Sequence, residues 1–203
     1  MADAPVTVAG ADGLLLAGGR SSRFGTDKRF ARLEGEGLAR IALDKLRAVV
    51  GRGAIHVATG RTARALPGLE EVPALADAVA DSGPLGGIVA GLRRTRTGIL
   101  VLACDVPRVR TETLRTVLET GEGGEHPVAA RCSGRWEPLI AYYPRSASNR
   151  LEAALRDGDR ALHRLLDELD AIPVEVSDPS ELANVNTPED LAALAKVSKE
   201  DTE

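Results

Sequence analysis

The sequence has few aromatic residues and a small net charge. Aromatic residues make up 2% of the 203 residues, so the hydrophobic 43% must come mainly from Ala, Leu, Val and Ile. Surfaces that bind nucleic acids combine clustered positive charge with aromatic rings for base stacking. A formal net charge of −4 and this shortage of rings exclude a general nucleic-acid surface.

Cysteine and long apolar runs are also scarce. Cys104 and Cys132 are too few and too far apart for a zinc site or a disulfide framework, which predicts reduced thiols and a cytoplasmic protein. No apolar run approaches the ~18 residues of a membrane span. The N-terminal Met-Ala-Asp-Ala-Pro lacks the basic and apolar regions of a signal peptide. We therefore expect neither a membrane nor a nucleic-acid partner.

The histidines do not indicate nucleophilic catalysis. His56, His126 and His163 stand in unrelated contexts, and none accompanies a recognisable Ser or Cys nucleophile. A Ser-His or Cys-His mechanism is therefore not expected.

Positive charge is concentrated near the N-terminus, directly after an apolar run at residues 14–17. The run predicts a buried strand, and Gly18-Gly19 follows it directly. Glycines let backbone N–H groups approach a polyanion closely, and nearby cations supply fixed charge. The cations that follow are Arg20, Arg23 and Lys28. This combination predicts a phosphate-binding loop.

The common phosphate loops do not fit this segment. A P-loop counted from Gly19 would need a second glycine where Phe24 stands, and Gly25 comes too late for a dinucleotide fingerprint. The ligand must therefore be held by another kind of loop.

Strand and helix patterns alternate along the chain. This order predicts an α/β fold: a three-layer α/β/α arrangement with a mostly parallel sheet, in a single domain over residues 1–197 and with a disordered tail at 198–203. Strands are expected at 14–17, 54–58, 72–76, 99–103 and 172–176, and a small antiparallel hairpin at 128–131 and 138–143. Helices are expected at 38–50, 84–92, 111–118, 147–156 and 160–169, and from Thr187, which is placed to cap the last helix.

Polar residues follow three of the predicted parallel strands, at the edge where such sheets bind ligands. Asp105 ends the most apolar strand and is placed to bind a hard cation such as Mg²⁺; the alternative is an Asp that caps the next loop. Asp77 and Asp81 lie in the loop 77–83 that follows the third strand. Asp81-Ser82 also fits an ordinary helix N-cap.

Two motifs resemble those of molybdenum cofactor guanylyltransferases, a family of nucleotidyltransferases. Residues 16–28 match the pattern LAGG-x-S-x-R-x-G-x-D-K, and residues 184–191 read N-V-N-T-P-E-D-L. The resemblance runs from Leu14 to about Leu194. It implies transfer of GMP from GTP to the phosphate of the molybdopterin cofactor, release of pyrophosphate, and a need for Mg²⁺. Proteins that handle the cofactor, or that act as chaperones of molybdoenzymes, are the partners it implies.

The resemblance also implies roles for particular residues. Arg23, Lys28 and Asp105 would be catalytic, with Asp105 as the metal ligand. The nucleotide would be contacted by Leu16, Ala17, Gly18, Gly19, Lys28, Asp77 and Asp105, with Asp77 favoured over Asp81. The acceptor would be contacted by Arg131, Arg135, Asn184 and Asn186. For the two asparagines, satisfying the turn before the last helix is the alternative interpretation.

The sequence departs from the family where some members carry an asparagine that contacts the nucleotide, because Ala58 stands there. Base recognition is therefore open. The first alternative is a cytidylyltransferase for the same cofactor or a nucleotidyltransferase for another small phosphate. The second, of another class, is a catalytically inactive nucleotide-binding adaptor.

Overall fold

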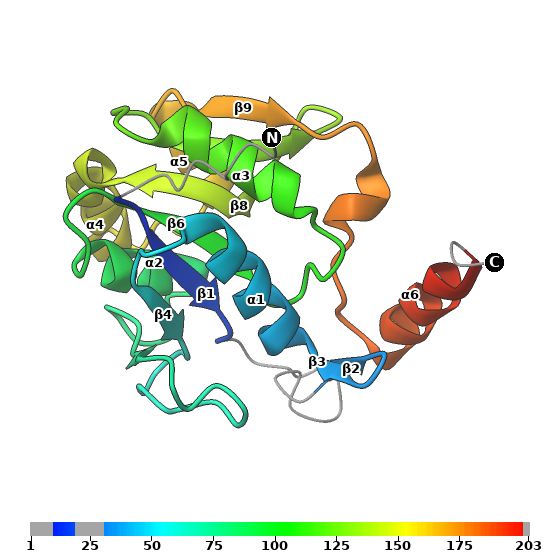
Figure 1. Cartoon of the computed structure of the whole chain (residues 1–203). Helices are drawn as coiled ribbons and strands as arrows, with labels where there is room; N and C mark the ends of the chain where they lie inside the picture. The colour runs from blue at the N-terminus through cyan, green and yellow to red at the C-terminus, as the bar shows by residue number, and fades with distance from the viewer. Residues whose placement is uncertain (1–9, 19–30, 201–203) are drawn as a thin grey trace, which may run out of the picture.

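A computed structural model describes residues 10–18 and 31–200 of the chain (Figure 1). Its centre is a seven-stranded sheet. In spatial order the strands are β5 (Ala74–Leu75), β4 (Ile55–Ala58), β1 (Asp12–Leu16), β6 (Gly98–Ala103), β8 (Arg135–Pro144), β7 (Val128–Cys132) and β9 (Ile172–Glu175).

Only β8 runs against the other strands of this sheet. β1 is parallel to β4 and β6, β5 is parallel to β4, and β9 is parallel to β7, whereas β8 is antiparallel to both β6 and β7. The predicted mostly parallel sheet with an antiparallel hairpin is therefore confirmed. Since β8 lies between β6 and β7, the hairpin is an integral part of the sheet.

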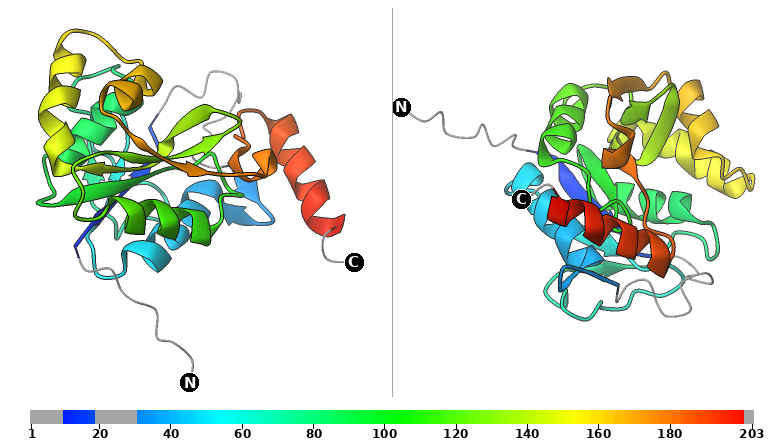
Figure 2. Two further views of the ribbon diagram at one scale, coloured as in Figure 1. Left: turned by 90° about the horizontal axis from the view of Figure 1, so that it is seen from above. Right: turned by 90° about the vertical axis from the view of Figure 1, so that its right-hand side faces the viewer.

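Helices cover both faces of the sheet, as the view from above shows (Figure 2). Side chains of α1 and α3 pack on one face, and those of α2, α4 and α5 pack on the other. The predicted three-layer arrangement is confirmed. The helices are α1 (Leu38–Val50), α2 (Pro84–Leu92), α3 (Thr111–Gly121), α4 (Ser148–Arg156), α5 (Leu162–Glu168) and α6 (Pro188–Glu200), with short 3₁₀ helices η2 (Arg145–Ala147) and η3 (Pro179–Leu182). None of the helices in this part of the chain has the length and apolarity that crossing a bilayer requires.

A second, two-stranded antiparallel sheet forms from β2 (Arg32–Leu33) and β3 (Glu36–Gly37), and the sequence did not predict it. Its turn residues Glu34 and Gly35 both have positive φ, 52° and 88°. This backbone geometry is typical of tight hairpin turns.

The C-terminal helix α6 stands apart from the three layers (Figures 1 and 2). The predicted cap is confirmed: the Asp190 N–H donates to Thr187 Oγ1 at 3.1 Å, and Asp190 Oδ2 accepts from the Thr187 N–H at 2.9 Å. Such reciprocal bonds satisfy N–H groups that a helix start leaves open. α6 extends to Glu200, past the predicted domain end, and residues 201–203 lie outside the described residues. Its apolar side packs in a small separate core of Ala31, Leu33, Leu38, Ile41, Val185, Leu191 and Leu194.

Candidate active site

The segment after β1 lies against the ends of the two neighbouring strands. The Ala17 N–H donates to the Ala58 carbonyl at 3.0 Å, and the Cys104 N–H donates to the Leu16 carbonyl at 3.1 Å. A Cβ atom on Gly18 would come within 2.7 Å of the Gly60 backbone nitrogen. Only glycine fits at this contact. Leu16, Ala17 and Gly18 therefore sit at the carboxyl edge of the sheet, as predicted.

Three predicted site residues of the first loop, Gly19, Arg23 and Lys28, lie outside the described residues. Their roles stay predictions from the sequence.

Asp77 lies against the start of α2 on the same edge. Its N–H donates to the Gly60 carbonyl at 2.8 Å, and a Cβ on Gly87 would lie 3.5 Å from Asp77 Oδ1. Two adjacent glycines, Gly86 and Gly87, thus leave room for this half-buried side chain. Burial raises the pKa of the Asp77 carboxyl, and the nearby charge of Asp81 raises it further. Because burial and a neighbouring negative charge both disfavour the ionised form, this carboxylate is stabilised by a partner that donates hydrogen bonds or carries positive charge.

Asp81 is in a different situation. It has a positive φ of 56°, and its exposed carboxylate pairs with Arg61 at 2.9 Å. The helix-cap interpretation of Asp81-Ser82 is wrong, because Gly83 holds the cap position of α2 and no side chain bonds there. The buried Ser82 hydroxyl instead donates to the Val79 carbonyl at 2.5 Å. The geometry leaves Asp77 as the carboxylate on this loop closest to the glycines of α2.

Ala58 offers nothing to a nucleotide base. Its side chain is 2% exposed. A Cβ on Gly87 would lie 2.9 Å from the Ala58 Cβ and equally close to Leu16 Cδ2, so Ala58 packs beneath α2. Any contact to a nucleotide base would therefore come from other groups.

Asp105 lies two residues after the end of β6, in which every residue is buried. Its carbonyl accepts a hydrogen bond from the Val185 N–H at 2.8 Å. This bond brings the turn before α6 beside Asp105. Asn184 and Asn186 are exposed on either side of the buried Val185. Two motifs far apart in the sequence therefore meet at one edge.

The hairpin of β7 and β8 carries the two predicted acceptor arginines. Arg135 is exposed, whereas Arg131 donates to Glu175 Oε1 from Nε at 2.7 Å and from a terminal nitrogen at 2.5 Å. The Arg131 guanidinium also lies 5.1 Å from the centre of the Trp136 ring, whose N–H donates to Asp167 at 2.7 Å. Arg131 is thus held in place by β9 and by the indole, a contact the sequence did not suggest.

Glu137 is a second carboxyl group near Asp105 that sequence reasoning missed. Burial raises the pKa of this half-buried group; the charges of His163 and Arg135 lower the pKa, and that of Asp105 raises it. Glu137 lies in the part of β8 that continues past the last residue paired with β6, Ile140. This part of the hairpin therefore projects beyond the carboxyl edge of β6.

The donor set at this edge fits Mg²⁺. Within residues 10–18 and 31–200, no group of three or more His, Cys, Asp or Glu side chains could enclose a metal ion. Mg²⁺ is commonly bound by one or two carboxylates together with substrate phosphates and water. Asp105 would supply one such carboxylate to an ion that arrives with a triphosphate.

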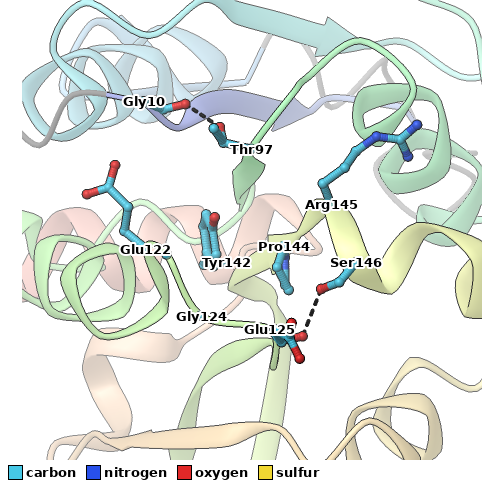
Figure 3. A pocket seen from close by; sticks show the side chains of 10 residues that line it. Gly10, Thr97, Glu122, Gly124, Glu125, Tyr142, Pro144, Arg145 and Ser146 are labelled. Atoms are coloured by element: carbon cyan, nitrogen blue, oxygen red, sulfur yellow. Dashed lines mark hydrogen bonds between the residues drawn. The ribbon is translucent and has the colours of Figure 1, made fainter.

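A cavity of about 450 Å³ lies at the opposite edge of the sheet (Figure 3). Gly10, Thr97, Glu122, Tyr142 and Arg145 are among the residues that line it. The Thr97 hydroxyl donates to the Gly10 carbonyl at one side of it (Figure 3). None of the described predicted site residues belongs to its lining, so it is separate from the candidate site.

Two further side chains, Lys45 and Glu181, hold the loop after Asp105. Lys45 Nζ donates to the carbonyls of Pro107 and Val109, both at 2.6 Å. Burial lowers the pKa of this lysine, and the charge of Glu181 raises it. Neither residue carried a sequence signal.

Several known proteins are similar to this chain in sequence or in fold. Residues 13–172 match the MobA-like NTP transferase domain. A molybdenum cofactor guanylyltransferase of Pseudomonas aeruginosa PAO1 is 40% identical over 191 residues, covering 88% of this chain and 91% of that protein. The one from Pseudomonas paraeruginosa PA7 is 38% identical over 185 residues, with the same coverage. The crystal structure of molybdopterin-guanine dinucleotide biosynthesis protein A from Archaeoglobus fulgidus superimposes with a TM-score of 0.76 at 26% identity, covering 93% of this chain and 99% of that one. The chain therefore belongs to the MobA-like NTP transferase family.

Proposed function

We propose that this protein transfers GMP from GTP to the terminal phosphate of molybdopterin bearing molybdenum, with release of pyrophosphate. The observation that carries the proposal is the meeting of the Leu16–Gly18 segment, Asp77, Asp105 and the Asn184–Asn186 turn at one sheet edge, in a chain whose relatives bear the name molybdenum cofactor guanylyltransferase.

In this reaction a phosphate oxygen of the acceptor forms a bond to the α-phosphorus of GTP. The bond from the α-phosphorus to its bridging oxygen breaks, and pyrophosphate leaves with those electrons. A phosphate monoester has a second pKa of about 6, so the acceptor is already largely a dianion at neutral pH. No protein base has to remove a proton. Positioning and charge stabilisation are then the main catalytic contributions.

Each described part of the site has a place in this scheme. Backbone groups of Leu16–Gly18 would line the nucleotide, with Asp77 facing it from the second loop. Asp105 would hold Mg²⁺, which when bound neutralises charge on the phosphates. Asn184 and Asn186 would present amides to the acceptor, beside Arg135 from the hairpin. Arg23 and Lys28, from the sequence motif, would hold the triphosphate. A cytoplasmic location and cofactor-handling partner proteins belong to the same proposal.

Guanine is the base we expect. It presents N1 and N2 donors and the O6 acceptor, which backbone carbonyls and amides can read without dedicated side chains. The buried Ala58 is consistent with such recognition, since it leaves the base to backbone groups. A site built in this way rejects a base with the wrong donor pattern because its own polar groups would be left unpaired.

The test is pyrophosphate release with GTP, CTP, ATP or UTP at equal concentration and molybdopterin as acceptor. Release with GTP well above the other three is the expected result. Comparable rates with CTP and GTP would contradict guanine specificity and leave only the nucleotidyltransferase assignment. Nucleotide binding without release for any of the four would instead indicate an inactive nucleotide-binding protein.

A further inference from the structure

Two segments far apart in the sequence are joined at both ends. The first is the loop from Asp105 to Arg110, between β6 and α3, and the second runs from Glu181 in η3 to Val185. At one end the Val185 N–H donates to the Asp105 carbonyl at 2.8 Å. At the other end Glu181 accepts from the Arg110 N–H at 3.1 Å and from Arg110 Nε at 2.7 Å. The loop that carries the proposed metal ligand is thereby tied to the segment that leads into Asn184 and Asn186.

The Glu181 end of this connection is buried. The residue is 3% exposed. Its Oε1 atom accepts from both the Arg110 N–H and the Thr113 hydroxyl, and its Oε2 atom accepts from Arg110 Nε. A buried carboxylate is stable only when its oxygens are satisfied in this way. Three donors from the start of α3 therefore hold one side chain of η3 in a single position.

Lys45 also anchors the first segment. Its two hydrogen bonds to Pro107 and Val109 attach the Asp105 loop to α1, and the nearby charge of Glu181 raises the pKa of this lysine. If Glu181 were lost, the loop would keep its two hydrogen bonds to Lys45, while the segment before Asn184 would lose its bonds to Arg110 and Thr113 and keep the one from Val185 to Asp105.

We propose that Glu181 is a positioning residue that fixes the Asn184–Asn186 turn relative to the Asp105 loop. The inference rests on the proposed function, in which Asp105 holds the metal ion of the nucleotide and the Asn184–Asn186 turn binds the acceptor. Glu181 touches neither substrate. It sets the distance between the two reacting phosphates, and misplacement on the order of 1 Å between reacting groups can cost a hundredfold in rate.

The variant Glu181→Gln tests this while preserving the size of the side chain. An amide can still accept from Arg110 N–H and Thr113, but its NH₂ group faces the Arg110 Nε–H, donor against donor. We expect kcat/KM for the acceptor to fall by about 10–100-fold, while the KM for GTP changes by less than about twofold. A residue that only stabilises the fold would not produce this split between the substrates.

Asp178→Asn is the matched control. Asp178 begins the same 3₁₀ helix, where it accepts from the N–H and hydroxyl of Ser180 at 2.9 Å each, and it is exposed. The control removes one negative charge near Arg108 and Arg110, keeps a side-chain oxygen that can accept from the Ser180 N–H, and leaves the hydrogen bonds of Glu181 in place. We expect its kinetic constants to stay within about twofold of the unmodified protein.

Amide hydrogen exchange measures how firmly Glu181 holds the turn, and it does not require turnover. In Glu181→Gln, amides in peptides spanning 181–187 should exchange at least about tenfold faster, while those of β4 should not change. Arg110→Gln removes the exposed guanidinium with its charge and its Nε donor, but keeps the Arg110 N–H and Thr113 donors to Glu181, so it should show the same pattern to a smaller degree even if Glu181→Gln fails to fold.

Equal losses for GTP and acceptor, or unchanged exchange at 181–187, would overturn the positioning role. Absence of guanylyl transfer in the unmodified protein would instead overturn the proposed function, and the exchange measurement would still decide whether Glu181 holds the turn.

Discussion

Replacing Lys45 by methionine removes the ammonium group that attaches the Asp105 loop to α1, and keeps most of the buried stem. The group donates to Pro107 and Val109 at 2.6 Å each. A hydrogen bond from a charged donor contributes about 1.5–3 kcal/mol to stability, and methionine leaves both carbonyls without this donor. Because methionine carries no charge, the desolvation cost of burying the ammonium group disappears, and this offsets part of the lost stability. We therefore expect a net destabilisation of about 3 kcal/mol.

This loss converts into a shift of the melting temperature. An unfolding entropy of about 2.1 cal/mol/K per residue gives about 0.43 kcal/mol/K for 203 residues, so 3 kcal/mol corresponds to about 7 °C. Differential scanning calorimetry measures it directly, and turnover below the transition should also fall because the Asp105 loop is less restrained.

Arg47→Met on the same helix is the control for this prediction. Arg47 is exposed and pairs with Glu71 at 2.9 Å and Asp44 at 3.5 Å. Exposed ion pairs contribute about 0–1 kcal/mol, so the control should lose no more than about 2 °C. A Lys45→Met shift as small as that of the control would refute the argument that the two carbonyl contacts support the loop.

Three further predictions concern the substrates. Asp105→Asn should keep the melting temperature but nearly abolish turnover and weaken Mn²⁺ binding by titration; near-normal activity at ordinary Mg²⁺ concentrations would rule out the ligand assignment. Lys28→Ala should lower kcat/KM for GTP by about 2–4 kcal/mol of transition-state stabilisation, the effect of losing one preorganised donor, and an unchanged value would contradict a phosphate role. Asp77→Asn should weaken GTP binding and yet melt at a higher temperature at pH 7. Because folding raises the pKa of Asp77 above 3.8, its stabilising contribution is complete below that pH and is lost as the pH rises through the folded pKa. The melting advantage of the variant should therefore vanish near pH 3.8, and one that persists there would disprove the explanation.

The sequence predicted those elements in which apolar spacing and end signals agree. α1 begins and ends at the predicted residues because its apolar stripe repeats with helical spacing. α6 begins at Pro188 after the Thr187 cap, as predicted. β5 is only two residues long, against five expected, and it begins directly after Pro73. A proline cannot donate to a strand ladder.

The sequence could not reveal features that depend on pairing across the fold. The turn of β2 and β3 places Glu34 at positive φ, where Asn or Gly would have signalled a hairpin. Lys45 looks like an ordinary charged residue on an amphipathic helix, and Glu181 like one on a polar loop. The role of Lys45 emerges only when α1 packs beside the loop after β6, and that of Glu181 only when η3 meets the start of α3. Arg131 was grouped with Arg135, but its partner Glu175 lies on another strand, which the sequence spacing does not show.

Trp136 is the single tryptophan of the chain, so the intrinsic tryptophan fluorescence of the protein reports on one position. The indole is 9% exposed, donates to Asp167 and lies under the Arg131 guanidinium. All tryptophan emission therefore originates from the hairpin beside the proposed acceptor site. A molecule that draws Arg131 away from the ring, or that changes the hydration of the indole, alters this emission in the unlabelled protein. Binding at the hairpin can thus be followed by fluorescence, separately from events at the nucleotide loops.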